Sequence, residues 1–294
     1  MSKTIIFFGT DTFSASALRS LIEAQYTIGA VITKPDSKSG RGQQLTAPLV
    51  KQIAEEHGIT VWQPTKLTDT TDDIKALGDP TELIGVLSSY GRIIPQSIID
   101  LFHPGIINIH PSLLPLYRGP SPIETAIVNG DMRTGVSIMK LTAEMDAGPV
   151  YAQEPYELDG TETAPELYET LSALGGRMLV ETLPSIIEGN LLPTPQQNTP
   201  IYCYLLKKED GVLRANELTA IQAERKVRAY LEYPKTRVEI ADHFVIATKA
   251  HVVEVEESPI DVTFKDSSYL HIDELIAPSG KKMSGEAFVN GYLA

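Results

Sequence analysis

Short, continuously apolar runs alternate with segments of helical periodicity in the first part of the chain. The apolar runs have the length of buried strands and span 4–8, 28–33, 83–87 and 106–109. Helical spacing of apolar residues follows at 13–24 and 46–57. Strands that are apolar throughout, rather than alternating, are typical of a parallel sheet covered on both faces. The pattern predicts an α/β fold with a Rossmann-like, mostly parallel sheet and helices on both faces.

The apolar pattern changes after residue 130. Residues 135–141 alternate in part and predict an edge or antiparallel strand, and 166–187 have apolar residues at spacings of three or four. Pro184 is expected to kink or end that helix. A proline-rich stretch without periodicity follows. We therefore predict a first domain over 1–188, a linker over 189–205 and a second domain over 206–294.

The second domain has the pattern of a small β domain. One helical face is expected over 220–231, and short strand-like pieces follow at 237–240, 244–248, 252–256 and 262–264. Several short strands separated by turns predict a small OB-like β-barrel.

Composition places the chain among cytoplasmic proteins. Of 294 residues, 42% are hydrophobic, yet no apolar run reaches the length of a membrane span. Residues 1–9 enter a strand at once, so no leader peptide is expected. Cys203 is the single cysteine, which fits a reducing compartment, and we expect it to be inert.

Charge is distributed unevenly. The formal net charge of −13 disfavours nucleic acid as a partner. Residues 205–238 nevertheless hold eight basic and five acidic residues, a net of +3, and include Lys207 and Lys208, whereas 241–277 have a net of −6. A basic face on a small barrel is typical of nucleic-acid binding, although a solvated charged face is the simpler interpretation.

Residues suited to carbonyl chemistry cluster at the end of the fourth apolar run. Asn108 and His110 are two apart and are predicted to share one face of a strand. A side-chain amide and an imidazole there can hold and protonate a carbonyl oxygen. Asp146, downstream, can hydrogen-bond the imidazole and fix which nitrogen faces the substrate. The set suits attack by a substrate's own amine. Three polar turn residues that only make hydrogen bonds within the protein would give the same sequence pattern.

Other sequence features exclude or suggest ligands. Gly9-Thr10 lacks the glycine fingerprint of nicotinamide enzymes, and His103 and His110 lack companions at metal-ligand spacing. The loop 33–45 is locally basic, and Arg41 stands between two glycines. Such a loop can become ordered on a phosphate backbone, or it can simply be solvated.

Several segments together resemble the methionyl-tRNA formyltransferase family over nearly the whole chain. The segments that carry the resemblance are 8–10, 33–42, 48–51, 89–95, 108–110, 112–115, 118–119, 146–148 and 278–284. Asp11 stands where the family usually has proline and is expected to loosen the first turn. Pro111 and 146–153 are similar to the related glycinamide ribonucleotide formyltransferases.

The resemblance implies a reaction, its substrates and its site residues. The formyl group would pass from 10-formyltetrahydrofolate, a co-substrate, to the amine of methionyl initiator tRNA, and Asn108, His110 and Asp146 would be catalytic. Folate contacts are expected at Ser112, Leu113, Leu114, Pro115, Tyr90, Gly91 and Ile93. Contacts with the tRNA are expected at Lys38, Arg41, Lys207 and Lys208. We expect a monomer that uses no metal and no nicotinamide and binds neither DNA nor a membrane.

Three alternatives remain at this point. The same chemistry could act on a small amine, either glycinamide ribonucleotide or an amino-sugar nucleotide. Water could replace the amine, which would make the protein a folate hydrolase. The fold could also serve as a non-catalytic tRNA- or folate-binding module.

Overall fold

The computed structural model describes residues 3–39 and 44–293, so Arg41 and its two glycine neighbours lie outside the described residues. The chain forms two compact units, each built from several segments. The first unit comprises Met1–Pro120, Gly135–Tyr156 and Tyr168–Tyr202, and the second comprises Ser121–Thr134, Glu157–Leu167 and Cys203–Ala294. The linear domain boundaries expected from the sequence stay a prediction. Over the described ranges, no helix has both the length and the apolar character needed to span a membrane.

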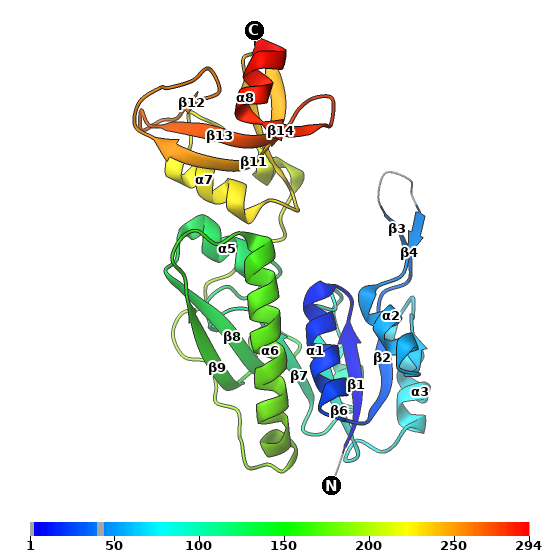
Figure 1. The fold of residues 1–294 in the computed structure, drawn as a ribbon. Helices are drawn as coiled ribbons and strands as arrows, with labels where there is room; N and C mark the ends of the chain where they lie inside the picture. Colours follow the sequence, from blue (N-terminus) through cyan, green and yellow to red (C-terminus); the bar gives the residue numbers. More distant parts are fainter. Residues whose placement is uncertain (1–2, 40–43, 294) are drawn as a thin grey trace. The chain divides into compact units, whose positions relative to one another are not determined.

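A seven-stranded sheet organises the first unit (Figure 1). Its strands, in spatial order, are β5 (Val61–Trp62), β2 (Ile28–Ile32), β1 (Thr4–Gly9), β6 (Leu83–Ser88), β7 (Ile106–His110), β8 (Arg133–Lys140) and β9 (Val150–Glu157). The first five are parallel, and β8 runs antiparallel to β7. A separate two-stranded sheet pairs β3 (Ser37–Ser39) with β4 (Gln44–Thr46). The predicted mostly parallel α/β architecture is confirmed.

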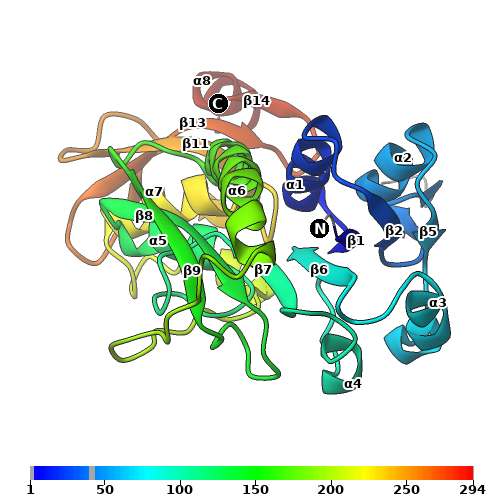
Figure 2. The same cartoon turned by 90° about the horizontal axis from the view of Figure 1, so that it is seen from below.

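Helices cover both faces of this sheet. They are α1 (Thr12–Glu23), α2 (Leu49–Glu56), η1 (Leu67–Thr70), α3 (Thr71–Ala76), α4 (Gln96–Ile99) and α6 (Ala164–Ile187). Figure 2 shows α1 and α6 on one side of the strands and α3 and α4 on the other. On the α3 and α4 side, Ile6, Phe8 and Ile106 share a buried core with Ile74 and Ile98. The prediction of two covered faces is therefore confirmed.

Three local expectations differ from the structure. The helix expected over 46–57 begins at Leu49, because Pro48 is its N-cap. Of the two outcomes expected at Pro184, a kink or an end, the end does not occur, because α6 continues through it to Ile187. Asp11 tightens the first turn rather than loosening it, since its carboxylate accepts a hydrogen bond from the Ser14 N–H (3.1 Å) at the N-terminus of α1.

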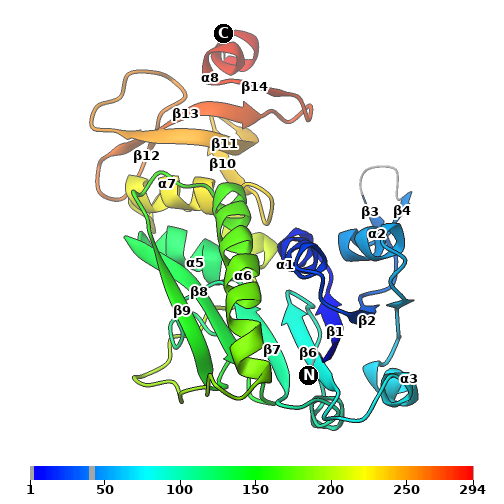
Figure 3. The same ribbon diagram turned by 60° about the horizontal axis from the view of Figure 1, so that its bottom comes forward.

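The second unit contains an antiparallel curled sheet with helices packed against it (Figure 3). The strands are β10 (Thr236–Ile240), β11 (His243–Val253), β13 (Tyr269–Ile276), β12 (Val262–Thr263) and, paired with β13, β14 (Lys282–Ser284). The helices are α5 (Pro122–Asn129), η2 (Lys208–Gly211), α7 (Ala220–Ala229), α8 (Gly285–Phe288) and η3 (Val289–Leu293). The two strands expected over 244–256 form the single strand β11, and β13 was not predicted.

Candidate active site

The carboxyl ends of three strands lie together at one edge of the parallel sheet. Gly9 ends β1 beside Ser88 of β6, and Ser88 is paired with Ile109 of β7. The strand order also changes direction here, because β1 has β2 on its other side. Ligands of open α/β sheets bind outside the carboxyl ends of the strands at such a point. This edge is therefore where a substrate is expected.

Asn108 and His110 lie on one face of β7, as the sequence predicted. Ile109 faces the other way, toward Gly175 of α6. Asn108 and His110 are 4% and 5% exposed, so β7 carries two polar side chains into a largely buried setting. The Asn108 amide donates to no other described residue, which leaves its N–H groups available to a ligand.

The two ring nitrogens of His110 have different partners. Nε2 lies 2.9 Å from the main-chain oxygen of Tyr117. Because a carbonyl only accepts, Nε2 carries the hydrogen of this bond. Nδ1 faces Asp146 Oδ2 at 3.8 Å, which is an ion-pair distance and too long for a direct hydrogen bond. Tyr117, and not Asp146 as the sequence suggested, therefore fixes the orientation of the imidazole.

Asp146 lies in a constrained loop, residues 144–149, named the aspartate loop below. Its backbone has φ 46°, and its Oδ2 accepts a hydrogen bond from the Gly119 N–H (2.9 Å). Gly119 has φ 123°, a conformation that favours glycine. A Cβ on Gly148 would lie 1.8 Å from the Lys140 carbonyl oxygen, so only glycine fits there. The sequence Asp-Ala-Gly thus places the carboxylate beside His110.

The turn 112–116 is braced by polar side chains from β8 and β9. Ser137 Oγ donates to the Ser112 carbonyl (2.6 Å) and accepts from the Leu114 N–H (3.1 Å). Gln153 donates to the Leu114 carbonyl (2.9 Å) and to Ser137 Oγ (2.8 Å). Ser112 Oγ itself donates to the Leu116 carbonyl (2.5 Å). The predicted rigid wall is therefore rigid because of hydrogen bonds as well as prolines.

The other predicted folate contacts have mixed surroundings. Tyr90 is 1% exposed and packs edge-on against Phe8, with ring centroids 5.9 Å apart. Its burial raises the pKa of its phenol. Gly91 has φ 67° and is exposed, whereas Ile93 is 86% exposed. Of these three residues, Ile93 offers the most apolar surface to a ligand, and all three contacts stay predictions.

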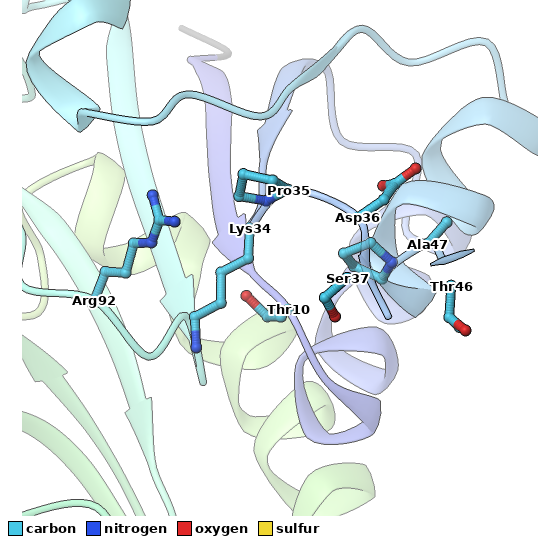
Figure 4. A pocket seen from close by; sticks show the side chains of 9 residues that line it. Thr10, Lys34, Pro35, Asp36, Ser37, Thr46, Ala47 and Arg92 are labelled. Atoms are coloured by element: carbon cyan, nitrogen blue, oxygen red, sulfur yellow. The ribbon is translucent and has the colours of Figure 1, made fainter. Parts of the chain in front are cut away.

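A pocket of about 470 Å³ opens beside the ends of β1 and β2 (Figure 4). Its lining residues are Thr10, Lys34, Pro35, Asp36, Ser37, Thr46, Ala47, Pro48 and Arg92. The carboxylate of Asp36 is paired with Lys51 (2.8 Å). Hydrogen bonds from Lys51 and then Gln63 lower the pKa of Asp36. Because Lys51 offsets that charge, Lys34 and Arg92 give the pocket a positive character suited to an anionic group.

The predicted tRNA contacts are placed only in part. Lys38 lies in β3, and Arg41 lies outside the described residues. Lys207 and Lys208 are exposed at the start of η2. All four tRNA contacts stay predictions.

Sequence reasoning missed four residues that shape the site: Tyr117, Ser137, Gln153 and Gln196. Tyr117 acts through its main chain, so its side chain gave no signal. Ser137 could have been noticed as a polar position within the apolar strand β8. Gln196 was assigned to a structureless linker, yet it hydrogen-bonds both Arg118 and the aspartate loop.

Two further expectations concern cysteine and metals. Cys203 is buried, and its Sγ accepts a hydrogen bond from the Ser121 N–H (3.3 Å), which accords with an inert role. Within the described parts of the chain, no three His, Cys, Asp or Glu side chains are grouped as a metal site would require.

Two family models match this chain. The model described as "Formyl transferase" matches residues 2–183, and "Formyl transferase, C-terminal domain" matches 205–293. Methionyl-tRNA formyltransferase of Nitratidesulfovibrio vulgaris is 37% identical, covering 99% of this chain and 93% of the relative. The Lactobacillus acidophilus protein of the same name is 36% identical, covering 98% and 95%.

A solved structure has the same fold. The N-formyltransferase of Helicobacter canadensis, determined with folinic acid and dTDP-3-aminofucose, superposes with a TM-score of 0.67. It is 18% identical and covers 92% of this chain and 98% of its own. At this identity the likeness concerns the fold alone.

Proposed function

We propose, since the chain belongs to the formyl transferase family, that it transfers the formyl group of 10-formyltetrahydrofolate to the amino group of methionyl initiator tRNA. This reaction would support translation initiation in the cytoplasm. Relatives named for it match the chain over both of its units. The protein would act as a monomer, with neither DNA nor a membrane as partner.

One observation carries the proposal most directly: the placement of His110 between a main-chain acceptor and Asp146, beside Asn108. These three side chains suit transfer of a carbonyl group between amines. No serine or cysteine side chain among the described residues hydrogen-bonds His110, which accords with a nucleophile supplied by the substrate.

In this mechanism the amine nitrogen of the acceptor attacks the formyl carbon. A carbon–nitrogen bond forms, and the electron pair of the carbonyl moves onto its oxygen. The Asn108 amide donates to that oxyanion. His110 donates from Nδ1, because Nε2 is engaged by Tyr117. When the bond from carbon to N10 of the folate breaks, the carbonyl reforms.

Asp146 manages the protons of this exchange. The attacking amine must lose a proton, and N10 of the departing folate must gain one. The Asp146 carboxylate, 3.8 Å from Nδ1, stabilises the protonated imidazole and relays the proton directly or through water. The proton lost by the amine is thus the one gained by N10, and the reaction consumes no reactant besides the two substrates.

The folate would lie along the wall 112–115 and the segment 90–93, which follow β7 and β6. The positive pocket beside Lys34 and Arg92 is next to that segment and suits an anionic part of a substrate. A small-amine acceptor is the competing assignment. Amino-sugar formyltransferases share the fold, but their low identity supports only the fold.

Formyl transfer by the purified protein tests the proposal. Charged initiator tRNA, glycinamide ribonucleotide and an amino-sugar nucleotide are compared as acceptors at equal folate concentration. We expect transfer to the methionyl-tRNA at a kcat/KM well above the other two. A higher kcat/KM for either small amine would overturn the acceptor, and release of formate with all three would instead indicate a hydrolase.

A further inference from the structure

Gln196 lies far from the catalytic residues in sequence but touches the aspartate loop in the structure. Its side-chain nitrogen donates to the carbonyl oxygens of Asp146 (2.7 Å) and Gly148 (2.8 Å). Its side-chain oxygen accepts from Nε (3.0 Å) and Nη2 (2.8 Å) of Arg118. We propose that Gln196 is a positioning residue that holds the Asp146 carboxylate at His110 for formyl transfer, an inference that rests on the proposed function.

All of the hydrogen-bonding capacity of this amide is used. A primary amide has two N–H donors and an oxygen that accepts twice, and each has a partner here. The partners also fix which way the amide faces, because a guanidinium only donates and a carbonyl only accepts. Rotating the amide by half a turn would oppose donors to donors and acceptors to acceptors. The contact is therefore specific to glutamine.

Arg118 is itself firmly placed, so Gln196 connects the aspartate loop to a fixed point. Arg118 is 8% exposed, and its main-chain N–H donates to the Ile201 carbonyl (2.9 Å). Its Nη1 lies 3.3 Å from the Tyr202 hydroxyl. The neighbouring Gly119 N–H is the donor to Asp146 Oδ2. Residues 118–119 thus hold Asp146 twice: directly at its carboxylate, and through Gln196 at its carbonyl.

The loop needs such support because its conformation is unfavourable locally. Asp146 has φ 46°, a region that non-glycine residues adopt only when the surroundings impose it. The distance from Asp146 Oδ2 to His110 Nδ1 is 3.8 Å, so a small displacement would separate the carboxylate from the imidazole. Misplacing a reacting group by about 1 Å can cost on the order of 100-fold in rate.

A simpler role is that Gln196 only attaches the segment after α6 to the body of the first unit. That role predicts lower stability with little change in kcat for the protein that remains folded. Positioning predicts a lower kcat with both KM values retained, since neither predicted substrate surface includes Gln196. The two roles can therefore be separated by kinetics together with thermal unfolding.

Two substitutions of Gln196 and one neighbouring control address this. Gln196→Ala removes all four hydrogen bonds and is expected to lower kcat about 10- to 100-fold, with both KM values within about 2-fold. Gln196→Glu keeps an acceptor for Arg118 but presents a carboxylate to two carbonyl oxygens, so we expect a comparable loss. Gln197→Ala is the matched control, because Gln197 is exposed and its side chain has no described partner.

A double-mutant cycle with Asp146→Ala gives the decisive readout. If Gln196 acts through Asp146, adding Gln196→Ala to Asp146→Ala lowers kcat by less than about 2-fold further. Losses that multiply in the double variant would overturn the proposal, as would a Gln196→Glu enzyme with wild-type kcat. If Gln196→Ala does not fold, Gln196→Glu carries the same cycle.

The cycle is independent of the acceptor. Each ratio can be measured with whichever amine the wild-type enzyme formylates. Failure of the methionyl-tRNA assignment would show in the wild type, whereas failure of the Gln196 proposal would show only in the ratios between variants.

Discussion

At the residue scale, the site is organised around the two nitrogens of one imidazole. A main-chain carbonyl engages Nε2 of His110, and a carboxylate 3.8 Å away faces Nδ1. A main-chain partner cannot change its protonation state, so it holds the ring without competing for the reacting proton. In the proposed reaction, the exchanged proton is then confined to the side shared by Nδ1, Asp146 and the substrate.

Substitution of the three proposed catalytic residues is the first prediction. Asn108→Ala, His110→Ala and Asp146→Ala should each lower kcat/KM at least about 100-fold, because each removes an oxyanion donor or a proton carrier. Steady-state formyl transfer measures the loss. His103→Ala, at an exposed histidine of the same unit, is the control. Near-wild-type turnover by His110→Ala would contradict the assignment.

The sequence could predict part of this site and not the rest, for a physical reason. Asn108 and His110 are recognisable because strand geometry places residues two apart on one face. The Tyr117 contact is made by the main chain, which every residue possesses. Gln196 reaches the aspartate loop across about 50 residues of chain, and no local periodicity encodes such a contact.

At the element scale, β8 and β9 brace the turn 112–116, where folate contacts are predicted. Ser137 from β8 and Gln153 from β9 hydrogen-bond each other and the turn after β7. The neighbouring strands therefore carry the polar groups that this turn requires. A surface that must recognise a flat ring system can in this way stay in one conformation before the ligand arrives.

Removal of the brace is the second prediction. Gln153→Leu leaves the Leu114 carbonyl without its side-chain donor, at a cost of about 1–3 kcal/mol if that oxygen stays dry. We expect the KM for the folate to rise about 10-fold while the KM for the acceptor changes little. Initial-rate kinetics with each substrate varied gives both constants. An equal rise in both would indicate general loosening of the sheet.

Sequence periodicity predicted the buried elements better than the half-exposed ones. The runs that became β1, β6 and β7 are apolar throughout and were recognised, whereas β9 and β13 alternate with polar residues and were not. Pro184 lacks the N–H that would bond the carbonyl four residues earlier, yet α6 continues past it to Ile187. Where the apolar pattern was weak, as in β9 and β13, tertiary packing rather than local sequence determined the secondary structure.

A buried tyrosine in the second unit gives the third prediction. Burial, with Asp210 and Glu124 nearby, raises the pKa of Tyr230 from 10.0 to about 12. Folding therefore favours the neutral phenol. The contribution of Tyr230 to the free energy of unfolding is complete below pH 10, the pKa in the unfolded chain, and is lost as the pH rises through 12, the pKa in the folded protein. The free energy of unfolding should fall by about 2 kcal/mol over that range through this group.

Urea unfolding at pH 9 and pH 11.5 measures this dependence. Tyr230→Phe should show a smaller fall than the wild type, because phenylalanine has no proton to lose. Tyr233→Phe is the control, since that ring is 50% exposed. Equal falls in the wild type and Tyr230→Phe would show that other groups control alkaline unfolding.

At the scale of the whole molecule, most of the predicted basic zone serves the second unit itself. Arg228 is paired with Glu224 (2.6 Å), and Arg225 donates to the Asn129 carbonyl (3.2 Å). Lys226 donates to the Asp210 carbonyl (3.2 Å), and burial lowers its pKa. Exposed Lys207 and Lys208 have no side-chain partner among the described residues. A count of charges therefore overstated the surface available to nucleic acid.

A weak salt dependence of tRNA binding is the fourth prediction. Each phosphate contact contributes about 0.7–0.9 to the slope of log Kd against log salt, and a protein with net charge −13 can make few of them. The double variant Lys207→Ala with Lys208→Ala should lower that slope by about 2 without changing folate binding. Lys249→Ala, an exposed lysine in the acidic part of the same unit, should leave it unchanged. An unchanged slope in the double variant would place the tRNA elsewhere. An equal drop for Lys249→Ala would mean that overall charge, and not local contact, controls binding.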